Sequence, residues 1–97
     1  MLQDPAKTDQ DKYKVVFEND RVRVLEYRDN PGEITTKHHH PDAVTISLTE
    51  FDRKLHLTDK EVVVHKKAGE VGWQPAQEHI GENIGSTHTH VILVELK

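Results

Sequence analysis

The sequence predicts a small all-β protein folded as one barrel or sandwich. Its apolar residues come in short, well-separated runs, and several runs alternate apolar and polar side chains, as strands with one buried face do. Gly, Pro, Asn and Asp turn signals separate these runs at intervals of roughly 8 to 12 residues, and no run has a convincing helical period. With 97 residues, the chain has room for one modest core, which predicts a single domain.

The elements follow in order from local signals. Residues 1–12 are polar with hardly any apolar side chain, so we expect a flexible N-terminal leader there, or an arm that docks elsewhere, followed by a barrel domain over 13–97. Two strands joined by a tight turn come first, and Asn30-Pro31-Gly32 then turns the chain into a histidine-rich strand, because Pro fixes one backbone angle and Gly supplies a positive φ. The expected strands with clear boundaries span 13–17, 21–28, 43–49, 55–58, 61–65, 71–74 and 87–97.

The run over 43–49 separates its side chains into two faces. Val44, Ile46 and Leu48 share one face, and hydroxyl side chains share the other. We expect one face to be buried, with the other wet or packed on a neighbouring chain. The hydroxyl residues are Thr45, Ser47 and Thr49.

A hairpin is predicted around Asp59-Lys60. A two-residue turn there would place Leu57 opposite Val62. The other face of this hairpin then carries His56 and His65, which we interpret as part of an outer polar surface.

Composition excludes several classes of function. A formal net charge of -4 and a pI near 6.0 argue against nucleic acid or an anionic membrane as partner, because both attract basic surfaces. The absence of cysteine rules out disulfides, thiolate metal sites and a cysteine nucleophile. No stretch approaches the roughly 20 apolar residues of a membrane span, and the N-terminus has no apolar signal region, so we expect a cytoplasmic protein.

Three consecutive histidines, His38 to His40, are the strongest chemical signal in the chain. Alternate side chains of a strand share a face, so His38 and His40 can converge on one point while His39 points away. Two imidazoles converging from one strand form most of a minimal metal site, because imidazole nitrogen binds ions such as Zn, Fe, Ni and Mn. The competing interpretation is an exposed polar turn that happens to be rich in histidine.

The order of these features resembles the cupin superfamily, which is identified by two motifs. The first motif is a Gly, five residues and His-x-His, and the second combines Gly, five residues and Pro with a later His, three residues and Asn. The matching residues are Gly32, His38 and His40 for the first motif and Gly69, Pro75, His79 and Asn83 for the second. The resemblance covers about 15–97 and is closest to single-domain bacterial cupins, some of which are associated with β-alanine or other small-molecule degradation.

The resemblance implies a cupin jelly-roll β-barrel in which His38, His40 and His79 bind one divalent metal ion, such as Fe, Ni, Zn or Mn. Two departures from the family pattern stand out. Val44, or Thr45 with a longer gap, stands where the family usually has a Glu ligand. The second motif has Gln77 in place of a Gly and is one residue shorter before its histidine.

Other site residues are expected from their positions near these motifs. Gln74 is our preferred fourth ligand, since its strand leads into His79, with Gln77, Glu78 and Asp42 as alternatives. The expected pocket residues are Trp73, His90 and Tyr27.

Two functions compete at this stage. The resemblance implies a metal-dependent, oxygenase-like enzyme acting on a small polar metabolite. The alternative is a cupin that binds or senses a metal or small molecule without turnover, which the missing carboxylate favours. A weaker third possibility is a structural dimer paired through Thr45, Ser47 and Thr49. A homodimer is compatible with each of them, because small cupins use sheet faces and N-terminal strands to associate.

Overall fold

The computed structural model describes residues 4–97 and is almost entirely antiparallel β-structure over that range. One short helix precedes the strands. The elements are α1 (Pro5–Thr8), β1 (Tyr13–Glu18), β2 (Val22–Asp29), β3 (His38–His40), β4 (Ala43–Ser47), β5 (Phe51–His56), β6 (Glu61–Lys66), β7 (Val71–Gln74), β8 (Gln77–Asn83) and β9 (Thr89–Leu96).

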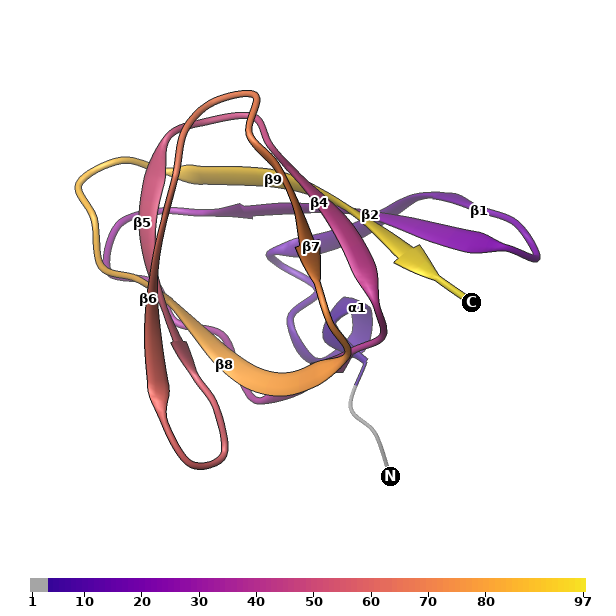
Figure 1. Cartoon of the computed structure of the whole chain (residues 1–97), viewed down its shortest axis with the longest axis horizontal. Helices are drawn as coiled ribbons and strands as arrows, with labels where there is room; N and C mark the ends of the chain where they lie inside the picture. Colours follow the sequence, from indigo (N-terminus) through magenta and orange to yellow (C-terminus); the bar gives the residue numbers. More distant parts are fainter. Residues whose placement is uncertain (1–3) are drawn as a thin grey trace.

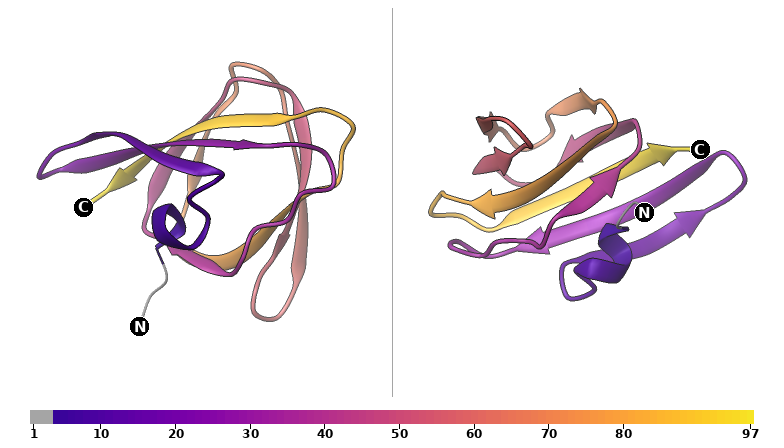
Figure 2. Two further views of the ribbon diagram at one scale, coloured as in Figure 1. Left: turned by 180° about the vertical axis from the view of Figure 1, so that it is seen from behind. Right: turned by 90° about the horizontal axis from the view of Figure 1, so that it is seen from below.

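The strands form two sheets that curl around a common interior (Figure 1). The five-stranded sheet has the order β1-β2-β9-β4-β7, and the four-stranded sheet has the order β3-β8-β5-β6. Neighbours in each sheet are mostly far apart in sequence, and seen from below in Figure 2 the strands β2, β9 and β4 run side by side. The predicted jelly-roll barrel is confirmed.

The orientation of β4 corrects the expectation for its two faces. Ala43 and Ser47 are buried and Thr45 lines the interior cavity, whereas the apolar side chains of Val44 and Ile46 lie on the outer face. The inward face is polar because the interior of this barrel holds polar groups, and the outward apolar side chains pack beside those of neighbouring strands.

The segment before β1 is docked on the barrel and is not a free leader. Asp4 caps α1 through the backbone N–H of Ala6 and forms a salt bridge with Arg23 (Nη1 to Oδ2, 2.8 Å). Asp9 is only 4% exposed. Of the two expectations, residues 4–12 therefore follow the docked arm and not the flexible leader, and residues 1–3 lie outside the described range.

The hairpin between β5 and β6 forms as predicted but in a different register. Leu57 donates its backbone N–H to the carbonyl oxygen of Lys60 at 2.8 Å, and Leu55 lies opposite Val62. The turn is thus one residue earlier than expected, because the close pair Leu57–Lys60 leaves 58–59 as its tip. His65 lies outside, next to Asp52 and Glu50, as predicted.

The buried apolar core is small, and polar residues share the interior with it. Its members are Tyr13, Leu25, Tyr27, Phe51, Val91 and Leu93. Buried polar side chains, among them three histidines and the carboxylates Asp29 and Glu95, lie on the same inward strand faces. No helix within residues 4–97 is long and apolar enough to cross a membrane.

Candidate metal centre

The register between β3 and β8 brings the three predicted histidines together. His38 lies directly opposite His79, and His40 is two residues along β3 on the same face. All three side chains are buried. Each offers a ring nitrogen, and these nitrogens lie within 4.8 Å of one another, so small side-chain rotations would let one ion contact all three.

A different oxygen acceptor orients each ring through Nδ1. His38 Nδ1 lies 3.2 Å from Asp9 Oδ2, and His40 Nδ1 lies 2.9 Å from Glu95 Oε2. His79 Nδ1 lies 2.8 Å from the Gln77 side-chain oxygen. Because these oxygens accept hydrogen bonds, each Nδ1 carries the proton and each Nε2 keeps its lone pair for a ligand. The donor set therefore fits a divalent metal ion.

Burial also keeps two of the rings neutral. It lowers the pKa of His38 from 6.5 to about 4, with help from the neighbouring His40. Burial lowers the pKa of His79 to about 2, with His40, His38 and Arg53 adding to the effect. Neutral imidazole is the form that binds metals, so no proton has to leave these two rings at neutral pH.

Two of the orienting groups are buried carboxylates that the sequence analysis did not identify. Glu95 is 2% exposed and accepts from Arg23 as well as from His40. Burial alone would raise the pKa of Asp9, but hydrogen bonds from Thr36 and its neighbours hold that pKa below its ordinary value. Asp9 therefore stays ionised beside His38 at neutral pH.

Tyr13 closes the near side of the histidine cluster. Its hydroxyl oxygen lies 3.4 Å from His38 Nε2 and 3.3 Å from His40 Nε2. A hydroxyl has one proton, so it can donate to only one of these nitrogens at a time. Burial raises the pKa of Tyr13, which keeps the phenol neutral in the absence of an ion. The phenol oxygen thus lies beside the point where an ion would bind.

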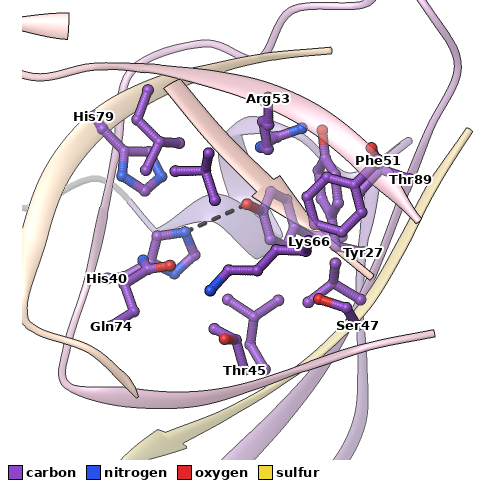
Figure 3. Close-up of a pocket in the computed structure, with 15 residues that line it drawn as sticks. Tyr27, His40, Thr45, Ser47, Phe51, Arg53, Lys66, Gln74, His79 and Thr89 are labelled. Atoms are coloured by element: carbon purple, nitrogen blue, oxygen red, sulfur yellow. Dashed lines mark hydrogen bonds between the residues drawn. The ribbon is translucent and has the colours of Figure 1, made fainter. Parts of the chain in front are cut away.

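A cavity of about 80 Å³ opens next to these rings (Figure 3). His40, His79 and Tyr27 line it, as does Gln74. The Gln74 side-chain nitrogen is buried and has no hydrogen-bond partner within the described part of the chain. A buried amide without a partner is costly, which indicates that a bound group satisfies it.

Two of the expected pocket residues lie elsewhere. Trp73 is 56% exposed on the outer face of the five-stranded sheet, because it pairs with the outward Val44. His90 also lies on that face, where its Nε2 is 2.8 Å from Glu26. The strand positions explain both corrections, since the inward neighbour of Trp73 on β7 is Gln74.

The other carboxylate and amide alternatives to Gln74 have different partners. Gln77 orients His79, Glu78 forms a salt bridge with Lys37, and Asp42 accepts from the backbone N–H of Ala76. None of the three lines the cavity.

Comparisons with known proteins agree with this geometry. No family model matches the sequence, and no curated protein does. Among solved structures, a cupin domain from Bordetella pertussis Tohama I is 29% identical, with a TM-score of 0.81 over 88% of this chain and 91% of the other. The chain has the cupin fold.

Two more distant structures show how widely this cupin fold is shared. An RmlC-like cupin family protein from Methanocaldococcus jannaschii is 19% identical, with a TM-score of 0.69 over 87% of this chain and 77% of the other. The polyketide cyclase RemF from Streptomyces resistomycificus is 18% identical, with a TM-score of 0.66 over 87% of this chain and 63% of the other. At these identities the likeness concerns the fold.

The strand patterns do contain a signal for some of the missed residues. Arg53 lies between Phe51 and Leu55 in the alternation of β5, and Glu95 continues the buried register of Val91 and Leu93 on β9. A charged residue in the apolar register of a strand is a candidate for the interior. Asp9 has no such signal, because it precedes the first strand.

Proposed function

We propose that this protein binds one divalent metal ion through His38, His40 and His79. We also propose that it is a metal-dependent enzyme of the oxygenase type, which acts on a small polar metabolite. The observation that carries the proposal is the buried cluster of three histidine ring nitrogens, with each ring oriented by an acceptor at Nδ1. When bound, the ion would supply Lewis acidity and a template that aligns the reactants.

The surrounding residues define what the protein itself contributes. Imidazole ligands add no negative charge, so the full dipositive charge of the ion would remain to attract an anionic or chelating ligand. Val44 points outward, so the family's usual carboxylate has no counterpart at that position. Gln74 lines the same cavity and remains our proposed fourth ligand, which would bind through its side-chain oxygen.

Elemental analysis tests the metal site. Protein purified without a histidine tag or a nickel column should contain close to one metal ion per chain, and His40→Ala should abolish it. His39→Ala is the matched control, because that ring belongs to the same run but alternates to the opposite face. Metal retained in His40→Ala at the wild-type level would contradict the assignment.

Oxygen consumption separates turnover from binding. The ferrous protein should consume oxygen with at least one member of a panel of small amino acids, thiols and keto acids. Tight binding of panel members with no consumption would instead support a non-catalytic binding protein, the alternative that the missing carboxylate favours.

We also propose that the protein forms a homodimer through the outer face of the five-stranded sheet. One apolar row crosses all five strands in register, from Phe17 through Val24, Val94 and Val44 to Trp73. Five strands spaced about 4.8 Å apart make this row about 19 Å long. Apolar faces of this extent mark interaction sites, and a second copy would present the same face. The face differs from the one expected from sequence, because Thr45 and Ser47 point inward.

Light scattering after size-exclusion chromatography tests the dimer. Val71→Glu places a charge on this face and should yield monomers. Val63→Glu is the control, because both valines are 63% exposed but Val63 lies on the four-stranded sheet. Equal masses for Val71→Glu and wild-type protein would rule out this interface.

A further inference from the structure

The cavity beside the histidine cluster has a distinctive charge. Its lining includes two cationic side chains, Arg53 and Lys66, and no carboxylate. The buried carboxylate next to Arg53, Asp29, is not part of the lining and is engaged by Arg53 and Asn83. An ion at the histidines would add further positive charge on the same cavity.

Arg53 is held rigidly with part of its donor set unused. Its Nη1 donates to Asp29 Oδ2 at 2.7 Å, and its guanidinium carbon lies 4.5 Å from the centre of the Tyr27 ring. Within residues 4–97, its Nε and Nη2 donate no hydrogen bond. Because a guanidinium presents its donors in a planar fork, one side of Arg53 is anchored while the other is open to a carboxylate.

Gly81 makes room for this guanidinium. A Cβ at Gly81 would lie 2.8 Å from Arg53 Cζ, closer than real side chains approach. Gly81 is two residues from His79 on the same face of β8, so the charge of Arg53 lies one side-chain position from the histidine cluster. Figure 3 shows Arg53 and His79 on the same side of the cavity.

Lys66 reaches the interior in a similar way. A Cβ at Gly72 would lie 3.3 Å from Lys66 Nζ and 3.4 Å from the Thr45 hydroxyl oxygen, which places the ammonium inside the barrel. Its one carboxylate contact is a long 3.4 Å approach to Glu70. Gln74, with its unpartnered amide nitrogen, follows Gly72 on the same strand face.

We propose that the cavity recognises a small carboxylate, whose oxygens accept hydrogen bonds from Arg53, Lys66 and the Gln74 amide. The inference rests on the proposed function, because it names the substrate class of the same site. At roughly 10 to 15 Å³ per water-sized position, the 80 Å³ cavity accommodates a ligand of about five to eight non-hydrogen atoms. A hydroxyl, amino or keto group next to the carboxylate can then extend toward the histidines.

Nuclear magnetic resonance titration of the metal-free, ¹⁵N-labelled protein tests this recognition. The probes are glycolate and its neutral counterpart glycolamide, which have nearly the same shape but differ in charge. Glycolate should shift the Arg53 Nε–H and Gly81 amide resonances saturably, at least ten-fold more tightly than glycolamide. Lys66→Gln should weaken glycolate binding by about ten-fold, since a charge-assisted hydrogen bond is lost.

Gly81→Ala provides a second variant that keeps Arg53 itself. The added methyl group displaces the guanidinium and should weaken glycolate binding at least ten-fold. Gly85→Ala is the control, because the atoms nearest to a Cβ there belong to Asp52, at 3.3 Å or more, and it should bind like wild type. The amide spectra establish that each variant is folded.

Equal affinity for glycolate and glycolamide would overturn the proposal, as would wild-type glycolate affinity in both Lys66→Gln and Gly81→Ala. Because the protein is metal-free, these results are independent of the proposed metal site. Loss of metal binding in His40→Ala and loss of glycolate discrimination are therefore separate outcomes.

Discussion

Glu95 joins the metal centre to the docked N-terminal segment, and its replacement by Gln tests both connections. One carboxylate oxygen accepts from Arg23 at 2.8 and 3.0 Å, and the other lies 2.9 Å from His40 Nδ1. A Gln side chain has one oxygen and one NH₂ group, so it can accept from only one of these partners. The other partner then faces a donor inside the protein.

The expected size of the effect follows from the remaining contacts. Arg23 keeps its two bonds to Asp4, so the loss is smaller than for a fully stranded charge. Leaving one buried donor unsatisfied costs about 1–3 kcal/mol of unfolding free energy. Loss of the acceptor that orients a metal-binding imidazole typically weakens metal affinity by about 10 to 100-fold.

Urea denaturation of the metal-free protein and Zn²⁺ titration against a competing chelator measure the two effects. Glu61→Gln is the matched control, because Glu61 also pairs with a histidine, His56 at 2.9 Å, but is 58% exposed. A surface pair of this kind contributes at most about 1 kcal/mol. If Glu95→Gln changes neither quantity more than Glu61→Gln does, Glu95 does not orient His40.

Three further predictions concern the same interior and the outer sheet face. Burial lowers the pKa of His38 to about 4 and that of His79 to about 2 in the folded chain, so the unfolded chain, with values near 6.5, takes up protons first as pH falls. In EDTA, the free energy of unfolding should be highest above pH 6.5 and fall by about 1.4 to 2.7 kcal/mol per pH unit toward pH 4, and a flat profile in urea titrations would contradict this. Tyr13→Phe should lower the stability of the metal-free protein by about 0.5–1.5 kcal/mol, because the His38 and His40 nitrogens lose their shared donor. Unchanged urea midpoints and slopes would argue against that hydrogen bond. Trp73 fluorescence should shift to longer wavelength on dilution as the proposed dimer dissociates, and a concentration-independent spectrum in a sample that light scattering shows to dissociate would place the interface elsewhere.

Much of the fold follows from local sequence signals. The turn at Asn30-Pro31-Gly32 is one example, and Gly32 has the expected positive φ of 85°. Alternation along a strand predicts that His38 and His40 share a face, because that relation depends only on backbone geometry. The pairing of His79 with them came from the family motifs, and the β3–β8 register supplies its physical basis.

Alternation does not determine which face of a strand points inward. On β4 the apolar residues alone favour an inward Val44, yet Val44 lies outside and Thr45 lines the cavity. Trp73 lies outside for the same reason, because β7 pairs with β4. The choice depends on what the other strands place in the interior, and here they contribute charged and polar groups.

The sequence by itself thus determined the all-β architecture, most strand positions and the histidines that share one strand face. Only the tertiary structure decided that Asp9, Glu95 and Gln77 orient the three rings and that Arg53 enters the cavity over Gly81. The reason is that strand periodicity and turn chemistry act over a few residues. Asp9 contacts His38 across 29 positions of sequence and Glu95 contacts His40 across 55, and such contacts exist only once the sheets have closed around them.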